Sequence, residues 1–321
     1  MNFSKDSIKI DPARETEKIV TKLKLELVQK LHKKGAVLGI SGGVDSSVVL
    51  ALCVKALGNE KILALMLPEK DSSPDSLELA KVLADKFKVK YVIEELSDSL
   101  TALGCYKRRD EAVKKVFPEY NESYKMKITI PKDSDGKGIL NFFNLSVIAP
   151  NDEEKIKRLP ITEYLQIVAA SNLKQRCRMN MLYYHAEENN YCVVGTGNKN
   201  EYKQGFFVKH GDGGVDLMPI GHLFKSQVYQ LAEYLGIPEE ILKRTPTSDT
   251  YSAEQTQEEF FFKVPFKVLD PIWLGVEMGE SAEVIADALG LELPFVSSVI
   301  NDIKSKIRTT EYLRYSPIFF D

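Results

Sequence analysis

A short glycine- and serine-rich segment, Ser41-Gly42-Gly43-Val44-Asp45-Ser46-Ser47, carries the clearest chemistry in the sequence. It follows the apolar run Ala36-Val-Leu-Gly-Ile40 and precedes an apolar stretch that ends near Leu57. Glycines let backbone amides approach an anion closely, a helix N-terminus adds positive potential, and serine hydroxyls add donors. An acidic residue in such a loop would repel phosphate unless it held a cation, so Asp45 is predicted to bind magnesium. The segment lacks the lysine of the GxxxxGK phosphate loop, and a turn without a ligand is the alternative interpretation.

This loop resembles the pyrophosphate loop of the N-type ATP pyrophosphatases, which split ATP between its α and β phosphates and adenylate an acceptor. A second set of segments selects among the members of that superfamily. In chain order they are Asn172-Leu-Lys174-Gln-Arg176-Cys-Arg178-Met, Gly195-Thr-Gly-Asn-Lys-Asn-Glu201-Tyr, Gly205-Phe-Phe-Val-Lys209-His-Gly211-Asp-Gly-Gly-Val-Asp216, Lys225-Ser-Gln227, Leu235-Gly-Ile-Pro238 and Pro246-Thr-Ser-Asp249. Together they are similar to NAD synthetase over roughly residues 17–100 and 165–315.

The resemblance implies a role for each matching position. ATP is expected to contact Ser41, Gly42, Gly43, Asp45, Ser46, Ser47, Thr196, Lys225 and Thr247, of which Asp45, Lys225 and Thr247 are the predicted catalytic residues. Asp45 and Glu201 are the predicted magnesium ligands, since two carboxylates could hold a cation against pyrophosphate. Arg176, Lys209 and Asp216 are predicted to bind deamido-NAD. The alternative for Glu201 and for these three residues is a solvated surface charge.

The implied reaction is the ATP-dependent amidation of deamido-NAD to NAD. The nicotinate carboxylate attacks the α-phosphorus, pyrophosphate leaves, and ammonia then attacks the carboxyl-adenylate to give the amide and AMP. The resemblance also implies a homodimer. Glutamine-dependent forms carry an added glutaminase domain, for which 321 residues leave no room. We therefore expect the chain to use free ammonia or ammonia from a separate glutaminase.

The match fails near the C-terminus, where Tyr312 and Leu313 occupy the positions of a family His-Lys pair that contacts the dinucleotide. Arg314 and Lys306 are the cations that could replace it. This departure leaves open a related ammonia-dependent ligase acting on a different carboxylate. A catalytically silent homologue is disfavoured because Asp45 and Glu201 are both present, and a tRNA thiolase is disfavoured because the sequence has no cysteine pair and no basic excess.

The elements that must position these residues alternate between strands and helices. This order predicts an α/β fold with a parallel twisted sheet covered by helices on both faces, like the adenine nucleotide alpha hydrolases. The expected strands are 36–40, 62–67, 91–93 and 191–194, and a long helix is expected over 161–188. We expect one domain over residues 1–321, a helical C-terminal segment at 265–321, and an insertion at 104–160 that is either a lid or subunit contact or a mobile loop. The polar stretch 248–259 is a candidate closing loop.

Composition is consistent with a soluble enzyme. Hydrophobic residues make up 44% and charged residues 28%, and the net charge is −3. This charge argues against a nucleic-acid partner, and the sequence has no apolar run of membrane-spanning length. The charged N-terminus is unlike a signal peptide, so the expected location is cytoplasmic, with no membrane partner. The four cysteines, Cys53, Cys105, Cys177 and Cys192, are too scattered for a disulfide framework or a zinc site.

Overall fold

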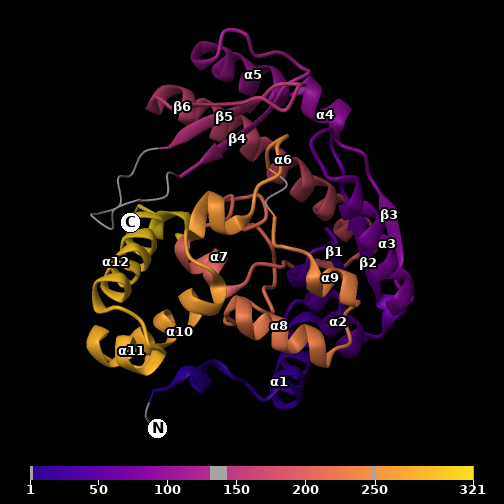
Figure 1. Cartoon of the computed structure of the whole chain (residues 1–321). Coiled ribbons are helices and arrows are strands. Elements are labelled where there is room, and N and C mark those ends of the chain that lie inside the picture. The colour runs from indigo at the N-terminus through magenta and orange to yellow at the C-terminus, as the bar shows by residue number, and fades with distance from the viewer. Residues whose placement is uncertain (1–2, 131–142, 248–249, 321) are drawn as a thin grey trace.

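A four-stranded parallel sheet forms the centre of the molecule (Figure 1). The computed structural model describes residues 3–130, 143–247 and 250–320. The strands are β1 (Ala36–Gly39), β2 (Ile62–Met66), β3 (Lys90–Ile93) and β7 (Cys192–Val193), in the order β3-β2-β1-β7. Ala36 of β1 lies opposite Ile62 on one side and Cys192 on the other. The predicted parallel sheet is confirmed, although β7 is shorter than expected because Val194 forms only an isolated bridge to Leu217.

Helices cover both faces of this sheet, as predicted. Alternate residues of β1 point to opposite faces, so that Ala36 and Leu38 lie in one hydrophobic cluster and Val37 lies in another. The first cluster is completed by α1 (Pro12–Lys24), α2 (Val44–Leu57), α3 (Pro74–Phe87), α8 (Lys225–Tyr234) and α9 (Glu239–Lys243). The second is completed by α4 (Ser97–Ala102), α5 (Cys105–Val116) and the long helix α6 (Ile161–Asn189). The described elements also include five short helical segments: Lys5–Ile8, Leu25–Lys30, Asn59–Lys61, Glu258–Phe262 and Glu311–Arg314.

The inserted segment forms a packed layer of its own at the top of Figure 1. Strands β4 (Lys125–Thr129), β5 (Asn144–Ile148) and β6 (Glu154–Arg158) make an antiparallel sheet in that order. Met126, Ile128, Leu145 and Val147 pack with α5 residues and Phe117 in a separate core. The described parts of 104–160 are therefore folded, while residues 131–142 lie outside the description. A role as lid or subunit contact stays a prediction.

The inserted layer also holds the chain segment that follows Thr247. The Ala253 amide donates to the Met126 carbonyl at 3.1 Å, and the Met126 amide donates to the Ser252 hydroxyl at 2.9 Å. Tyr251 is buried in the core of the layer, and the Gln255 side-chain amide donates to the Ile128 carbonyl. Part of the predicted closing loop 248–259 is thus docked on β4, whereas residues 248–249 lie outside the described residues.

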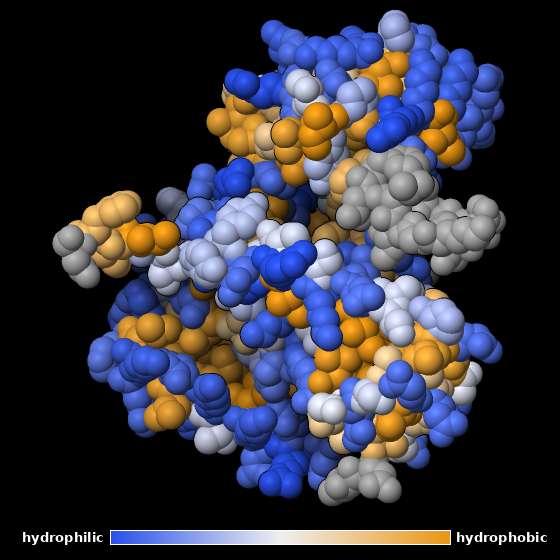
Figure 2. All heavy atoms as spheres, turned by 90° about the vertical axis from the view of Figure 1, so that its left-hand side faces the viewer, coloured by the Kyte–Doolittle hydropathy of each residue, from blue (hydrophilic) through white to orange (hydrophobic). Residues whose placement is uncertain are grey.

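The C-terminal part is helical, as predicted. Helices α10 (Phe266–Glu277), α11 (Ala282–Leu289) and α12 (Leu293–Thr309), with a final turn at Glu311–Arg314, pack around Trp273 and Phe262. Phe3 and Ile8 pack against the same core, so the N-terminal segment lies beside these helices (Figure 1). Beyond them the chain projects as an apolar tail (Figure 2), in which the exposed fractions of Ile318, Phe319 and Phe320 are 74%, 85% and 97%. Within the described ranges, no helix combines the length and the apolar character that crossing a membrane requires.

Candidate active site

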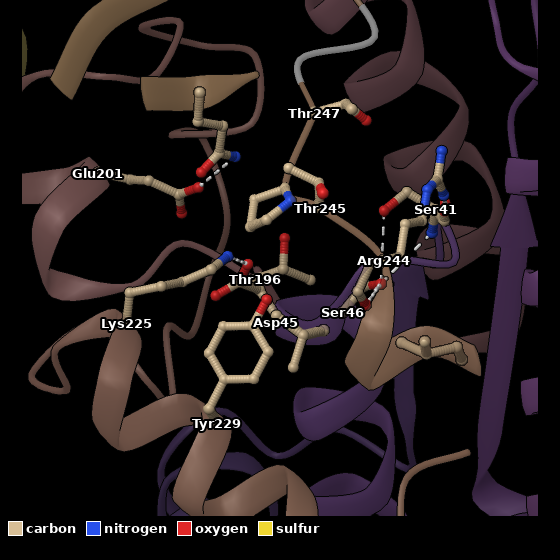
Figure 3. Close-up of a pocket in the computed structure, with 15 residues that line it drawn as sticks. Ser41, Asp45, Ser46, Thr196, Glu201, Lys225, Tyr229, Arg244, Thr245 and Thr247 are labelled. Atoms are coloured by element: carbon tan, nitrogen blue, oxygen red, sulfur yellow. Dashed lines mark hydrogen bonds and ion pairs between the residues drawn. The ribbon is translucent and has the colours of Figure 1, made fainter. Parts of the chain in front are cut away.

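A cleft opens at the carboxyl edge of the central sheet, where α/β folds commonly bind ligands. Its empty volume is about 630 Å³, counted out to its open mouth, and it lies where α2, α7 (Lys199–Gln204), α8 and the segment after α9 meet (Figure 3). Eight predicted site residues line it: Ser41, Gly43, Asp45, Ser46, Thr196, Glu201, Lys225 and Thr247. The sequence blocks that predicted an ATP site therefore converge on one cleft.

The glycine-rich loop presents an open helix N-terminus to this cleft. Gly43 is the N-cap of α2, and no side chain caps that end, so the first-turn amides are available to an anion. Gly42 does not line the cleft and has a different role. Its φ is +70°, and a Cβ there would lie 2.8 Å from the Ser76 carbonyl oxygen, so the turn packs against α3 only if this residue is glycine. Ser47 is fully buried and its hydroxyl donates to the Gly43 carbonyl, which stabilises the turn.

Asp45 is held by two buried donors. The Lys225 ammonium forms an ion pair with one carboxylate oxygen, and the Asn198 side-chain amide donates to the other at 2.9 Å. Lys225 is only 1% exposed. Burial alone lowers the pKa of Lys225, but the nearby Asp45 and Glu201 carboxylates raise it above its ordinary value. The lysine therefore remains positively charged at the cleft wall (Figure 3).

Glu201 lines the same cleft, from α7. Asn198 caps this helix: its side-chain oxygen accepts from the Glu201 amide, and the Glu201 carboxylate accepts from the Asn198 amide, both at 3.1 Å. The other Glu201 oxygen accepts from the Gln257 side chain at 3.2 Å. Burial and the neighbouring Asp45 charge raise the pKa of Glu201, while Lys225 opposes the shift. The site thus holds two carboxylates whose mutual repulsion a cation would relieve.

The sequence analysis missed several residues of this cleft. Arg244 donates to the Ser76 hydroxyl at 2.8 Å and reaches the Ser41 carbonyl at 3.4 Å, beside the phosphate loop. Tyr229 and Gln257 line the wall near Lys225 and Glu201, and fully buried Asn198 joins Asp45 to the cap of α7. Arg244 lies three residues before Thr247, and its closeness in the sequence to the segment Pro246-Thr-Ser-Asp249 could have indicated it. The roles of Asn198 and Gln257 depend on contacts between distant segments.

The wall containing Thr247 is fixed by local pairing. Thr247 forms an antiparallel bridge with Thr256, and the Gln257 amide donates to the Pro246 carbonyl at 3.0 Å. Because Ala253 and Gln255 of the same loop are bonded to β4, the described part of this wall is continuous with the inserted layer. Thr247 and Gln257, which both line the cleft, are therefore held in place by this pairing.

Comparison with known proteins assigns the chain to a family. The model of the family described as NAD synthase matches residues 15–128 and 147–317. The chain belongs to the NAD synthase family.

Curated relatives agree with this assignment. An NH(3)-dependent NAD(+) synthetase of Rhizobium meliloti is 47% identical over 98% of this chain and 94% of the relative. One of Thermotoga maritima is 35% identical over 92% of this chain and 96% of the relative. Among solved structures, an NH3-dependent NAD synthetase from Campylobacter jejuni has a TM-score of 0.63 at 23% identity and covers 98% of this chain and 100% of its own. The NMN synthetase from Francisella tularensis has a TM-score of 0.66 at 21% identity with the same coverage, and at these identities the two structures support the fold alone.

The predicted acceptor-binding residues of this NAD synthase family member lie outside the cleft lining. The Arg176 guanidinium donates to the Lys209 carbonyl at 3.3 Å, so these two residues lie together. Asp216 accepts from the Val193 amide at 2.8 Å and contacts the Tyr183 hydroxyl at 3.0 Å. Tyr183 is a further residue that the sequence analysis missed. The structure thus groups Arg176 with Lys209 and ties Asp216 to the end of β7.

The two C-terminal cations, Arg314 and Lys306, are bonded to other parts of the chain. The Arg314 guanidinium donates to the Tyr202 and Ile307 carbonyls at 3.2 and 2.9 Å, and Lys306 pairs with Asp302. Lys209 donates to the Tyr312 and Tyr315 carbonyls at 3.3 and 3.2 Å. The segment around Tyr312 and Leu313 is therefore bound to Lys209 through its backbone, and Arg314 and Lys306 are engaged elsewhere.

A cluster of buried charges surrounds Lys174 of α6. Lys174 forms ion pairs with Glu69 at 3.1 Å and Asp71 at 2.6 Å, and it donates to the Thr250 carbonyl at 3.0 Å. Arg109 of α5 also pairs with Asp71. Burial alone raises the pKa of Asp71, but Lys174 and Arg109 lower it below its ordinary value. Lys174 therefore joins α6, the loop after β2 and the segment that follows Thr247.

The four cysteines are all free and buried. Burial raises the pKa of the Cys177 thiol, and Arg178 offsets this only in part. Cys53 and Cys192 have still higher thiol pKa values, for the same reason. Raised values keep the thiols protonated, so these side chains act as core residues.

Proposed function

We propose that this chain amidates deamido-NAD to NAD, using ATP and ammonia, through a carboxyl-adenylate, with release of AMP and pyrophosphate. The observation that carries the proposal is the convergence of eight predicted ATP and magnesium residues on one cleft, in a chain that is 47% identical to an NH(3)-dependent NAD(+) synthetase over nearly its full length. The name of that relative also favours deamido-NAD over the different carboxylate left open by Tyr312 and Leu313.

ATP would lie with its phosphates against the N-terminus of α2. The uncapped amides after Gly43 and the hydroxyls of Ser41 and Ser46 supply donors, and Lys225 and Arg244 supply positive charge. This positive charge is needed because an anionic carboxylate can attack the α-phosphorus only if the negative charge of the phosphate is neutralised. Thr196 and Thr247 also line the cleft and would add hydroxyl contacts (Figure 3).

Asp45 and Glu201 fit a magnesium ion by their chemistry. Both are carboxyl groups that line the cleft, and burial, together with the Asp45 charge, raises the pKa of Glu201. The residues described here contain no set of three or more metal-ligating side chains, so phosphate and water oxygens would complete the shell, as magnesium prefers. Magnesium bound there would neutralise charge on the departing pyrophosphate.

The residues in and around the cleft supply positioning and charge, and the proposed reaction needs no protein nucleophile. The buried cysteines agree with this. Arg176, Lys209 and Asp216 would bind the dinucleotide acid and bring its carboxylate toward the α-phosphorus. The mixed anhydride hydrolyses in water, so the loop between Thr247 and Gln257 would shield it.

We further propose that the protein is a homodimer. Ile161, Leu165 and Tyr184 on α6 are 67%, 58% and 56% exposed, and this apolar exposure supports a contact between copies along that helix. Sedimentation of the purified protein measures its mass in solution, and a monomer would contradict this proposal.

The nitrogen donor follows from the relatives, whose names specify ammonia. Free ammonia would reach the adenylate directly, or a separate glutaminase would deliver it. Comparing ammonium with glutamine as the sole nitrogen source measures this: we expect NAD from ammonium and none from glutamine alone.

The acceptor is tested by NAD formation. Purified protein is incubated with ATP, magnesium and ammonium, and with deamido-NAD, nicotinate mononucleotide or no acceptor, and the amides are separated by chromatography. The proposal predicts amidation of deamido-NAD well above the mononucleotide. Preference for the mononucleotide, or AMP without amide, would overturn it.

A further inference from the structure

A buried carboxylate on α10 lies outside the cleft and has no role in the mechanism above. Asp270 is fully buried and accepts three hydrogen bonds: from the Ser226 amide at 2.8 Å, from the Ser226 hydroxyl, and from the Asn200 side-chain amide at 2.6 Å. Burial raises the pKa of Asp270 to about 6, although these donors oppose the shift. Because a buried carboxylate is costly unless its donors are in place, this arrangement fixes its partners relative to one another.

Asn200 links Asp270 to Lys225 by hydrogen bonds. It is fully buried, and its side-chain oxygen accepts from the Lys225 backbone amide at 2.9 Å while its amide group donates to Asp270. These two partners fix the orientation of the Asn200 side-chain amide. The opposite orientation would set its NH2 group against the Lys225 amide and its oxygen against the Asp270 carboxylate. Asn200 also lies next to Glu201 on α7, so one short helix carries both residues.

The first turn of α8 is therefore capped from outside. Phe224, its N-cap residue, has no side-chain oxygen, and the Lys225 and Ser226 amides are bonded instead to Asn200 and Asp270. Phe266, on the same helix as Asp270, lies 5.9 Å from the Lys225 ammonium. The C-terminal helical part thus fixes the backbone from which Lys225 reaches Asp45.

We propose that Asp270 is a positioning residue that acts through Asn200 and Ser226 to hold Lys225 in place for the ATP phosphates. The proposal rests on the proposed function only in taking Lys225 as an ATP contact. A lysine side chain has several freely rotating bonds, so fixing its backbone limits the positions that its ammonium can take.

The hydrogen-bond pattern suggests a reciprocal exchange as the test. In Asp270→Asn the new amide group must face a donor, either Asn200 or Ser226, so one buried donor is left unpaired. In the double variant Asn200→Asp/Asp270→Asn, the carboxylate at 200 accepts from the Lys225 amide and from the amide at 270, and the oxygen at 270 accepts from Ser226. Each group is paired again, and the negative charge has moved from position 270 to position 200.

Magnesium-ATP affinity by calorimetry and the KM and kcat for ATP are measured on folded protein, with Asp302→Asn as control. Asp302 is a partly buried carboxylate on α12 that forms ion pairs with Lys263 and Lys306. We expect Asp270→Asn to weaken ATP affinity and raise KM by about tenfold or more, the exchange to return both to within about threefold of wild type, and the control to leave both unchanged. If the single variant does not fold, Ser226→Ala removes one bond and is expected to raise KM by about threefold.

The outcomes separate this proposal from the proposed function. Unchanged ATP affinity and KM in folded Asp270→Asn, or in Ser226→Ala, would overturn the positioning role, as would an exchange variant that folds but binds ATP no better than the single variant. A wild-type protein that binds ATP but does not amidate deamido-NAD would contradict the proposed function, while the affinity comparison would still decide the role of Asp270.

Discussion

Replacing Lys174 by methionine tests the buried ion pairs between α6 and the loop after β2. Methionine has a similar length, so the substitution removes mainly the charge. It breaks the pairs with Glu69 and Asp71, at 3.1 and 2.6 Å, and the bond to the Thr250 carbonyl, at 3.0 Å. The three charged side chains are 2%, 0% and 4% exposed, so water cannot replace the lysine.

Removing one partner of a buried ion pair costs about 3–5 kcal/mol. Arg109 remains bonded to Asp71, and the Tyr106 hydroxyl remains bonded to Glu69 at 2.8 Å, so the lower end applies. We expect Lys174→Met to lower the free energy of unfolding by about 3 kcal/mol at pH 7.5. This corresponds to a fall in melting temperature of about 6–12 °C.

The loss should also depend on pH. In the wild type the pKa of Asp71 is lowered, so its contribution is present above the unfolded pKa and is lost as pH falls through the folded value. Without Lys174 the pKa of Asp71 rises, so protonation at lower pH relieves the unpaired charge in the variant. The difference between wild type and variant should therefore shrink from pH 7.5 to pH 4.5.

Urea denaturation followed by circular dichroism measures both effects. Lys243→Met is the matched control, because the Lys243–Glu239 pair is 74% exposed on each side and is expected to contribute nothing measurable. A loss below about 1 kcal/mol at pH 7.5, or a loss that does not change with pH, would refute the account of this cluster.

Three further substitutions test the cleft and its surroundings. Glu201→Gln keeps an oxygen for the Asn198 amide but removes a charge, so the magnesium concentration for half-maximal rate should rise about tenfold, and an unchanged magnesium titration would exclude Glu201 as a ligand. Arg244→Ala should raise the KM for ATP about tenfold, because hydrogen bonds from charged groups contribute about 1.5–3 kcal/mol, and a normal KM would place Arg244 outside the phosphate site. Tyr183→Phe removes the hydroxyl that contacts Asp216. The KM for deamido-NAD should therefore rise severalfold while the KM for ATP stays constant. Equal effects on the two KM values would contradict a role of Tyr183 in binding deamido-NAD.

The nucleotide loop could be predicted because its determinants are adjacent in the chain. A buried strand, Gly42 with its positive φ, and an uncapped helix N-terminus follow one another within a few residues, and each leaves a signal in residue type. The alternating core of β1 and β2 is equally local. Periodicity and turn chemistry were therefore sufficient for the sheet and for its phosphate-facing edge.

The inserted layer was predicted only as an excursion, although a signal was present. Lys125-Met126-Lys127-Ile128-Thr129 alternates exposed or half-buried residues with buried ones, which is typical of a strand with one buried face. Its partner β5 lies beyond residues 131–142, and its other contact is the segment around Ser252 and Ala253. Pairings over more than a hundred residues leave no local pattern.

The contacts that each residue of the segment Gly195–Glu201 makes could not be predicted either. Asn198 and Asn200 are both buried and two residues apart, yet Asn198 contacts Asp45 and Asn200 contacts Asp270. Which asparagine serves which element depends on where α2 and α10 pack around α7. On the acceptor side, the resemblance alone suggested Arg314 and Lys306, and neither could be judged before their carbonyl and carboxylate partners were known.

The central claim is that the carboxylate of deamido-NAD is adenylated by ATP in the cleft around Asp45. The most direct test measures AMP and NAD together, with ATP, magnesium and ammonium, in the presence and absence of deamido-NAD, for wild type and Asp45→Ala. We predict AMP and NAD in equal amounts only when deamido-NAD is present, and a loss of about a hundredfold or more in Asp45→Ala. ATP binding without AMP release that depends on deamido-NAD, or full activity in Asp45→Ala, would contradict the account.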